Sequence, residues 1–233
     1  MIYITGDIHG KTKRITDFAE KFDVNENDVI ILLGDVGANY YGGEKDHRMK
    51  TELSQIKATI LCIHGNHEMR PWEADGYKQT IWNGGKVWIQ EEFPNLLFAI
   101  DGEIYVIEGK RYIAIGGAYS VDKAWRNLHN YGWWESEQPS EEIKAFVEKQ
   151  LRENEIDIIL SHTCPRKYEP IEAFLPIIDQ ETVDAGTEEW LDQIEDSTNY
   201  EAWYCGHWHT DKKIDKIHFL FESWETVEKE WAL

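Results

Sequence analysis

Four short apolar runs constrain what this chain can fold into. They are IYIT at 2–5, VIILL at 29–33, TILCI at 59–63 and IDIIL at 156–160. Their length and β-branched content predict strands buried on both faces, as in a sheet covered by helices. Between the runs, apolar residues recur at helical spacing, first at Ile15, Phe18, Ala19 and Phe22 and later within 141–152. The alternation of such strands and helices predicts an α/β fold.

The middle of the chain adds strands of another kind. LLFAI at 96–100 and EIYVI at 103–107 are separated by Asp101-Gly102, a two-residue signal for a hairpin, and RYIAI follows at 111–115. This antiparallel meander favours a second sheet, and with it a four-layer helix/sheet/sheet/helix sandwich of mixed sheets. Residues 116–139 lack periodicity and are predicted to form a long ordered loop. Since no linker or internal repeat divides the sequence, residues 1–233 are expected to form a single domain.

Five segments with Gly, Asp, His or Asn follow apolar runs. They are GDIHG at 6–10, GDVG at 34–37, GNHE at 65–68, SHT at 161–163 and GHWH at 206–209. Loops beyond the carboxyl ends of neighbouring strands converge on one crevice of an α/β sheet. We therefore expect these five segments to form one site, although each motif alone would be weak support for it.

The ligand types in these segments point to metal binding. They supply two carboxylates, one amide and four imidazoles, from Asp7, Asp35, Asn66, His9, His162, His207 and His209, with His67 in addition. One tetrahedral zinc needs only four ligands, whereas seven ligands with a carboxylate able to bridge fit two divalent ions. Without thiolates, Mn, Fe, Zn or Ni suits the set better than a structural zinc.

As an ordered set, D-x-H, GD, GNHE, H and GHxH resembles the calcineurin-like metallophosphoesterase superfamily, over residues 6–209. The resemblance implies a metallophosphoesterase-like β-sandwich with two metal ions, for which we favour Mn. It also implies that Asp7, His9 and His209 hold one ion, that Asn66, His162 and His207 hold the other, and that Asp35 bridges them. His67 would then be the catalytic histidine, which protonates the leaving oxygen.

The same residues explain why such a site would hydrolyse a phosphoester. Two divalent ions against the charges of Asp7 and Asp35 leave the site cationic, so a metal-bound hydroxide can approach an anionic phosphate. A nearby imidazole can donate a proton to the leaving group, which typically contributes about 10²–10⁴-fold.

One departure from the superfamily bears on the substrate. Its protein Ser/Thr phosphatases usually continue GD-x-x-D-R-G, but Ala38 and Asn39 stand at the Asp and Arg positions here. A protein phosphatase would thus lack its orienting acid and its phosphate-binding arginine, and Asn39 or Glu68 remains to orient His67. We therefore favour a phosphodiester or nucleotide over a phosphoprotein as the substrate, with a protein phosphatase and a catalytically silent metal-binding module as alternatives.

Charge and cysteine content limit the partners. With 24 Lys+Arg against 44 Asp+Glu the net charge is −20, which disfavours long nucleic acid and hence a nuclease. No apolar stretch reaches the roughly 18 residues of a membrane helix. Cys62, Cys164 and Cys205 are widely spaced and expected to be reduced thiols, and with no export signal in view the cytoplasm is the expected location. The expected partner is a small phosphoester, and no obligate protein partner is inferred.

Several residues outside the motifs have two interpretations. Single basic residues are more often solvated surface charges than phosphate-binding groups, and this holds for Arg48, Arg70, Lys123, Arg126 and Arg166. Trp125, Trp133 and Trp134 could stack a nucleobase, although packing in a small satellite core is the commoner use of such rings. His47, His64, His129 and His218 match no ligand position and are expected to be structural.

Overall fold

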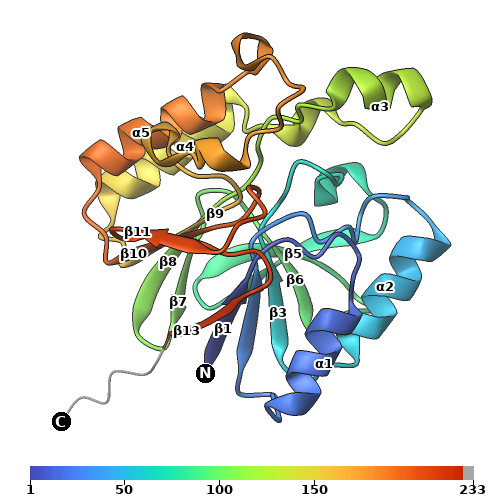
Figure 1. The fold of residues 1–233 in the computed structure, drawn as a ribbon. Coiled ribbons are helices and arrows are strands. Elements are labelled where there is room, and N and C mark those ends of the chain that lie inside the picture. Colours follow the sequence, from blue (N-terminus) through green and yellow to red (C-terminus); the bar gives the residue numbers. More distant parts are fainter. Residues whose placement is uncertain (228–233) are drawn as a thin grey trace.

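The computed structural model describes residues 1–227 as two mixed β-sheets packed face to face and covered by helices (Figure 1). Within these residues the first sheet runs in the order β13 (Trp224–Val227), β1 (Ile2–Thr5), β2 (Val29–Leu32), β3 (Thr59–Cys62), β6 (Leu96–Ala99), β5 (Gly85–Gln90) and β4 (Tyr77–Trp82). The second sheet runs in the order β11 (Lys212–Ile214), β12 (Ile217–Phe219), β10 (Ala202–Cys205), β9 (Ile158–Ser161), β8 (Lys110–Ile115) and β7 (Ile104–Ile107).

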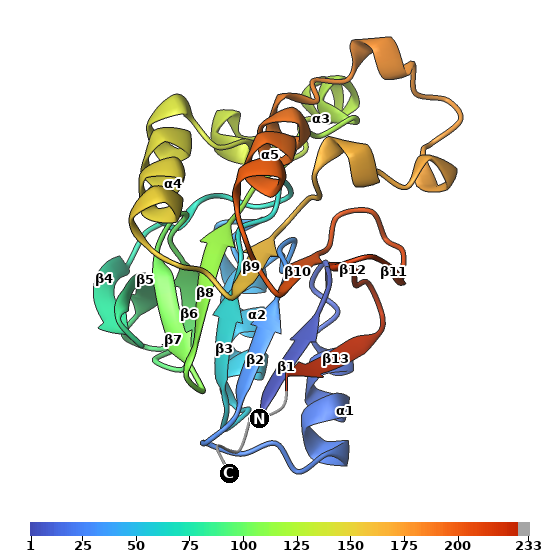
Figure 2. The ribbon, with the colours of Figure 1, turned by 90° about the vertical axis from the view of Figure 1, so that its left-hand side faces the viewer.

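Helices cover the outer face of each sheet (Figure 2). α1 (Lys13–Lys21) and α2 (Glu44–Ser54) pack on the first sheet, and α4 (Glu141–Glu153) and α5 (Gly186–Ser197) pack on the second. Ser140 caps α4, since its side chain accepts a hydrogen bond from the backbone N–H of Ile143. The helix/sheet/sheet/helix sandwich predicted from the sequence is therefore confirmed.

Alternation along the central strands explains why both faces are buried. On β2 and just beyond it, Ile31 and Leu33 point into the core between the sheets, whereas Ile30 and Leu32 point toward the helices. Each such side chain contributes roughly 1.5–3 kcal/mol to the free energy of folding when it is fully buried. A continuous apolar run is what a strand buried on both faces requires, and this is why these short runs are informative.

The hairpin predicted at Asp101-Gly102 is wrong. β6 pairs with β3 and β5 in the first sheet, while β7 pairs with β8 in the second, so the chain crosses between the sheets at this point. Leu97 on β6 and Tyr105 on β7 both enter the core between the sheets. If β6 and β7 paired edge to edge, their apolar side chains would belong to a single sheet. In separate sheets, these side chains face each other across the core and are buried against each other.

Two further elements differ from the prediction. The sequence analysis did not predict a hairpin formed by β4 and β5, although its turn is Asn83-Gly84, with φ of 48° and 90°, a common two-residue hairpin signal. The 116–139 segment is not all loop, because it contains α3 (Lys123–His129) and the short 3-10 turn η2 (Glu135–Glu137).

Further 3-10 turns lie in the loops, at η1 (Pro71–Glu73), η3 (Arg166–Tyr168), η4 (Ile171–Ala173) and η5 (Gln180–Thr182). The three cysteines are buried and free. Among the described helices, none has both the length and the hydropathy to cross a bilayer.

Candidate metal centre

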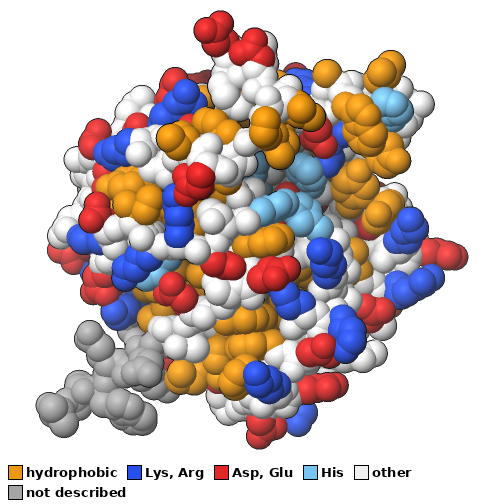
Figure 3. Space-filling model, viewed as in Figure 1, with side chains coloured by type: hydrophobic (Ala, Val, Ile, Leu, Met, Phe, Trp, Pro, Cys, Tyr) orange, Lys and Arg blue, Asp and Glu red, His pale blue; other side chains and the backbone are white. Residues whose placement is uncertain are grey.

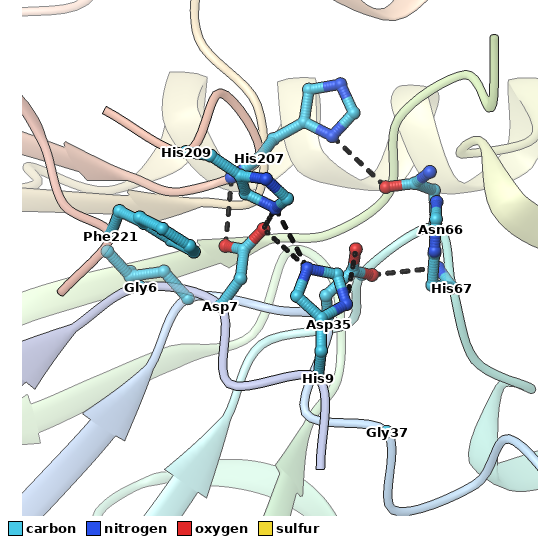
Figure 4. A network of polar contacts seen from close by, with 12 residues as sticks. Gly6, Asp7, His9, Asp35, Gly37, Asn66, His67, His207, His209 and Phe221 are labelled. Carbon is cyan, nitrogen blue, oxygen red and sulfur yellow. Dashed lines mark hydrogen bonds and ion pairs between the residues drawn. The ribbon is translucent and has the colours of Figure 1, made fainter. Parts of the chain in front are cut away.

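The five predicted segments meet at one rim of the sandwich. Figure 4 shows residues of GDIHG, GDVG, GNHE and GHWH next to one another there. β1, β2 and β3 run parallel in the first sheet, and β9 and β10 run parallel in the second. Asp7, Asp35, Asn66, His162 and His207 each follow one of these strands within four residues. The rim therefore gathers side chains that are up to 202 positions apart in the sequence, from Asp7 to His209.

Asp7, His9 and His209 form a first cluster of potential ligands. The Nε2 atoms of the two histidines lie 2.9 Å apart, and His209 Nε2 lies 3.3 Å from Asp7 Oδ2. Asp7 Oδ1 accepts a hydrogen bond from the His207 backbone N–H at 2.9 Å, whereas its buried Oδ2 has no hydrogen-bond partner. A buried, unpartnered carboxylate oxygen facing two imidazoles fits a cation-binding position.

Asn66, His162 and His207 form a second cluster. The Asn66 Oδ1 atom lies 2.8 Å from His162 Nε2 and 3.1 Å from His207 Nδ1. Asn66 is held in this orientation because its Nδ2 donates to Ser120 Oγ at 2.9 Å. His162 Nδ1 lies 2.8 Å from the Leu33 carbonyl, which can only accept, so in the tautomer with its hydrogen on Nδ1 the lone pair of Nε2 faces Asn66. Lone pairs that converge in this way suit a metal ion.

Asp35 lies between the two clusters. Its Oδ2 is 3.9 Å from His9 Nδ1 and its Oδ1 is 3.6 Å from His162 Nε2. Oδ1 also accepts a hydrogen bond of 2.8 Å from the His67 backbone N–H, which ties the GDVG segment to the GNHE segment. The structure therefore brings together all eight residues predicted for the site.

Backbone strain is concentrated in the same place. His9, Asp35, His207 and His209 have φ between 44° and 65°, in the left-handed region that non-glycine residues seldom adopt. Such conformations cost of order 1–3 kcal/mol each and persist where surrounding contacts enforce them. The fold thus holds four predicted ligands, drawn from the two clusters and from Asp35 between them, in strained conformations.

Two motif glycines leave room for ligands from neighbouring strands. A Cβ atom on Gly65 would lie 2.0 Å from Asp35 Oδ1, and one on Gly206 would lie 2.2 Å from Asp7 Oδ1. Neither position can carry a side chain without displacing a carboxylate. The glycines of GNHE and GHWH therefore leave the space that the two carboxylates occupy.

The protonation states of the cluster suit metal binding. Burial, together with the nearby His162, lowers the pKa of His207 to about 3, so the imidazole is neutral near pH 7. Burial alone would raise the pKa of Asp35, but the surrounding histidines His162, His67 and His9 outweigh it and hold that pKa below its ordinary value. A carboxylate and a neutral imidazole are the forms that coordinate metals.

His67 has a neighbour that the sequence does not identify for this role. A guanidinium nitrogen of Arg126, on α3, contacts Nδ1 of the His67 ring and lies 3.3 Å from its Nε2. Arg126 is itself fixed by Asp122, at 2.8 Å, and by the carbonyl of Gly132, at 2.8 Å. The sequence analysis favours a solvated surface charge over a phosphate-binding group for Arg126, but its side chain is buried. No local pattern links it to a histidine 59 positions earlier.

The two residues suggested for orienting His67 contact other groups. Asn39 Oδ1 accepts a hydrogen bond from Tyr77 at 2.8 Å. The buried Glu68 carboxylate accepts from the backbone N–H groups of Gly37, at 3.1 Å, and Gly65, at 3.3 Å. Glu68 thus joins the two loops that carry Asp35 and Asn66, and burial together with Asp35 raises its pKa to about 7.

The other phosphate-binding candidates are placed differently. Arg70 is buried in an ion pair with Asp101, and Lys123 lies over the Trp133 ring. Arg48 lines a separate hollow beside α2. Arg166 lines the cavity above the clusters, where it bonds to Glu169 at 3.3 Å. Three of the histidines expected to be structural have partners outside the clusters, namely Glu92 for His47, the Trp125 carbonyl for His129 and Glu225 for His218, whereas Nε2 of the buried His64 has no hydrogen-bond partner.

The clusters form the floor of a cavity of about 460 Å³. Figure 3 shows histidines grouped in the middle of this face, with hydrophobic side chains around them.

Comparison with known proteins agrees with this geometry. The model of the calcineurin-like phosphoesterase family matches residues 1–211, and the chain therefore belongs to that family. It is a family of metal-dependent phosphoesterases, and the two clusters supply candidate ligands for a divalent metal centre.

One solved structure supports the fold alone. The chain is similar to TT1561 of Thermus thermophilus, with a TM-score of 0.51 and 13% identity over 88% of this chain and 80% of that one. It also matches the protein of unknown function AQ665 from Aquifex aeolicus, at 13% identity over 95% and 89% of the two chains, with a TM-score of only 0.37. No protein of curated function matches the sequence.

Proposed function

We propose that this protein is a two-metal phosphoesterase that hydrolyses a small or exposed phosphoester. The observation that carries the proposal is the convergence of two ligand clusters on the shared carboxylate of Asp35, 3.9 Å from His9 and 3.6 Å from His162. Asp7, His9 and His209 would hold one ion, Asn66, His162 and His207 the other, and Asp35 would bridge them. We favour Mn for both, with Fe, Zn or Ni as alternatives.

The donor set fits such ions, because Asp7 Oδ2 is buried without a partner and four imidazoles face three oxygen donors. When bound, two divalent ions supply an activated water and withdraw charge from the phosphoryl oxygens.

The chain itself positions the proton donor. The His67 backbone is tied to Asp35 and its ring is held beside Arg126, so the imidazole stays at the cavity floor next to the clusters. From there it can donate a proton to the leaving oxygen of the ester. Removal of that proton donor should slow turnover without emptying the metal site.

The alternatives have less support. A protein Ser/Thr phosphatase would use the Asp and Arg that Ala38 and Asn39 replace, so we favour a phosphodiester or nucleotide. A silent metal-binding module would be expected to have lost some ligands, whereas all seven and His67 are present and adjacent. The buried free cysteines fit a reducing compartment, and we propose the cytoplasm.

The test combines metal analysis with turnover of bis(p-nitrophenyl) phosphate and p-nitrophenyl phosphate in the presence of Mn²⁺. His67→Ala should retain metal and lose about 10²–10⁴-fold in turnover. Asp35→Asn should lose both metal and turnover. His129→Ala is the matched control, because this exposed histidine on α3 lies outside the clusters. Wild-type protein that binds no metal and cleaves neither ester, or His67→Ala with full activity, would refute the proposal.

A further inference from the structure

The cavity above the clusters has a mostly apolar wall on the side away from the metal ligands. The connection between β9 and α5, with its turns η3, η4 and η5, forms one part of this wall, and the start of the α3 segment forms another. Figures 1 and 2 show both segments standing above the ends of the strands. Their apolar contributions include Phe174, Leu175, Ile178, Val183 and Val121.

These side chains are placed to receive a ligand. Phe174 stacks on Trp208, which follows the ligand His207, with ring centroids 5.5 Å apart, so the apolar wall continues directly from the metal clusters. Leu175 is 54% exposed although it faces the cavity. A volume of about 460 Å³ lies within the usual range for small-molecule sites.

The charges around the wall disfavour further anionic groups on the ligand. Asp122, Glu169 and Glu188 line the cavity, whereas Arg166 is the one Lys or Arg among its described lining residues. Arg166 is already hydrogen-bonded to Glu169. A substrate with additional phosphates would therefore meet no unpaired cation among the described lining residues beyond the metal site.

We propose that this cavity binds an uncharged, apolar alkyl or aryl group carried by the phosphate of the substrate. The inference rests on the proposed function and narrows its substrate class, because it keeps the phosphodiesters favoured there and no longer favours nucleotides. The phosphate would lie over the metal clusters, and the apolar group would extend between Ile178 and Val121 toward Phe174. Nucleotides would then be poorer substrates than phosphoesters of apolar alcohols.

Binding of alkylphosphonates tests this without turnover, because their carbon–phosphorus bond is not hydrolysed by a phosphoesterase. Isothermal titration calorimetry would measure the Kd of methyl-, butyl- and hexylphosphonate for the Mn²⁺-loaded protein, with adenosine 5′-monophosphate as the comparison. Kd should fall by about two- to fourfold per methylene, which corresponds to burial of up to ~0.8 kcal/mol per CH₂. Hexylphosphonate should also bind more tightly than the nucleotide.

Two neighbouring isoleucines provide a variant and its control. Ile178 lines the cavity and is half-buried, whereas Ile177 is 90% exposed and does not line it. Ile178→Glu should abolish the dependence of Kd on chain length. Ile177→Glu should behave as wild type. The melting temperature and metal content of both variants would show that the fold is intact.

The outcomes separate this inference from the proposed function. A Kd that is independent of chain length, hexylphosphonate that does not bind, a nucleotide that binds more tightly, or an unchanged slope in Ile178→Glu would each overturn the inference, even if nitrophenyl esters are cleaved. A steep slope in a protein that cleaves no ester would support the binding site and contradict the proposed function alone.

Discussion

The buried ion pair between Arg70 and Asp101 should be a major determinant of stability near the site. Arg70 follows His67 by three residues, and Asp101 lies at the crossing between the sheets. Their side chains are 2% and 4% exposed, and Nη1 of Arg70 lies 2.5 Å from Oδ2 of Asp101. Nε of Arg70 also donates to the carbonyl of Ser136 at 3.0 Å. The pair therefore fastens the loop that carries Asn66 and His67 to the segment that crosses between the sheets.

Arg70→Met should lower the free energy of unfolding by about 3–5 kcal/mol, because it leaves a carboxylate buried without its cation. Asp101 would keep the hydrogen bond from the Gly116 N–H, at 2.6 Å, which favours the lower half of that range. The double variant Arg70→Met/Asp101→Asn should recover roughly 1–3 kcal/mol, since no charge then remains buried.

Urea unfolding followed by tryptophan fluorescence, on metal-free protein at pH 7, measures these differences. Arg111→Met is the control, because Arg111 is 38% exposed and pairs with the 90% exposed Glu155, so its loss should cost less than about 1 kcal/mol. If Arg70→Met unfolds within about 1 kcal/mol of wild type, or the double variant is less stable than the single one, the pair does not anchor this loop.

Three other predictions concern the site and its surroundings. Gly65→Ala should weaken metal binding by roughly 10–100-fold because a Cβ would meet Asp35 Oδ1 at 2.0 Å, whereas Gly43→Ala, with nothing within 4 Å, should not, as metal titration can show. Saturating Mn²⁺ should raise the melting temperature by roughly 5–10 °C and EDTA should reverse this, since an ion at about 100 times its Kd stabilises by about 2.7 kcal/mol; an unchanged melting temperature would contradict it. Burial raises the pKa of Glu188 from 4.5 to about 7. Between these pH values the folded state retains a proton that the unfolded state releases. The free energy of unfolding should therefore fall by about 3 kcal/mol as pH rises from 4.5 through 7. Urea unfolding should show that the free energy of unfolding falls less between pH 5 and pH 8 in Glu188→Gln than in wild type. Equal decreases in wild type and Glu188→Gln would refute the raised pKa of Glu188 as the cause.

The positions of the candidate ligands could be predicted because each is encoded locally. Asp7, Asp35 and Asn66 each follow a short apolar strand within four residues, and parallel strands bring their carboxyl ends to one rim. The same argument covers His162 and His207 in the second sheet. Knowledge of the strands was therefore enough to place residues that are far apart in the chain.

The surroundings of His67 could not be predicted in this way. Arg126 reaches the ring because α3 projects over the rim, and that placement depends on tertiary contacts such as the hydrogen bond from Arg126 to the Gly132 carbonyl. The prediction at Asp101-Gly102 failed for a related reason. A turn signal predicts only that the chain changes direction. Which sheet the next strand joins depends on which apolar faces are buried together.

The close approach of Gly65 to Asp35, and of Gly206 to Asp7, makes the motifs depend on one another in pairs. Because each glycine has no side chain, the carboxylate that follows a different strand can occupy the space beside it. GNHE therefore depends on GDVG, and GHWH depends on GDIHG, although the members of the second pair lie at opposite ends of the chain. A segment grafted from this protein into another scaffold would carry its histidines but only half of each such contact, so the motifs should be transferable only in these pairs.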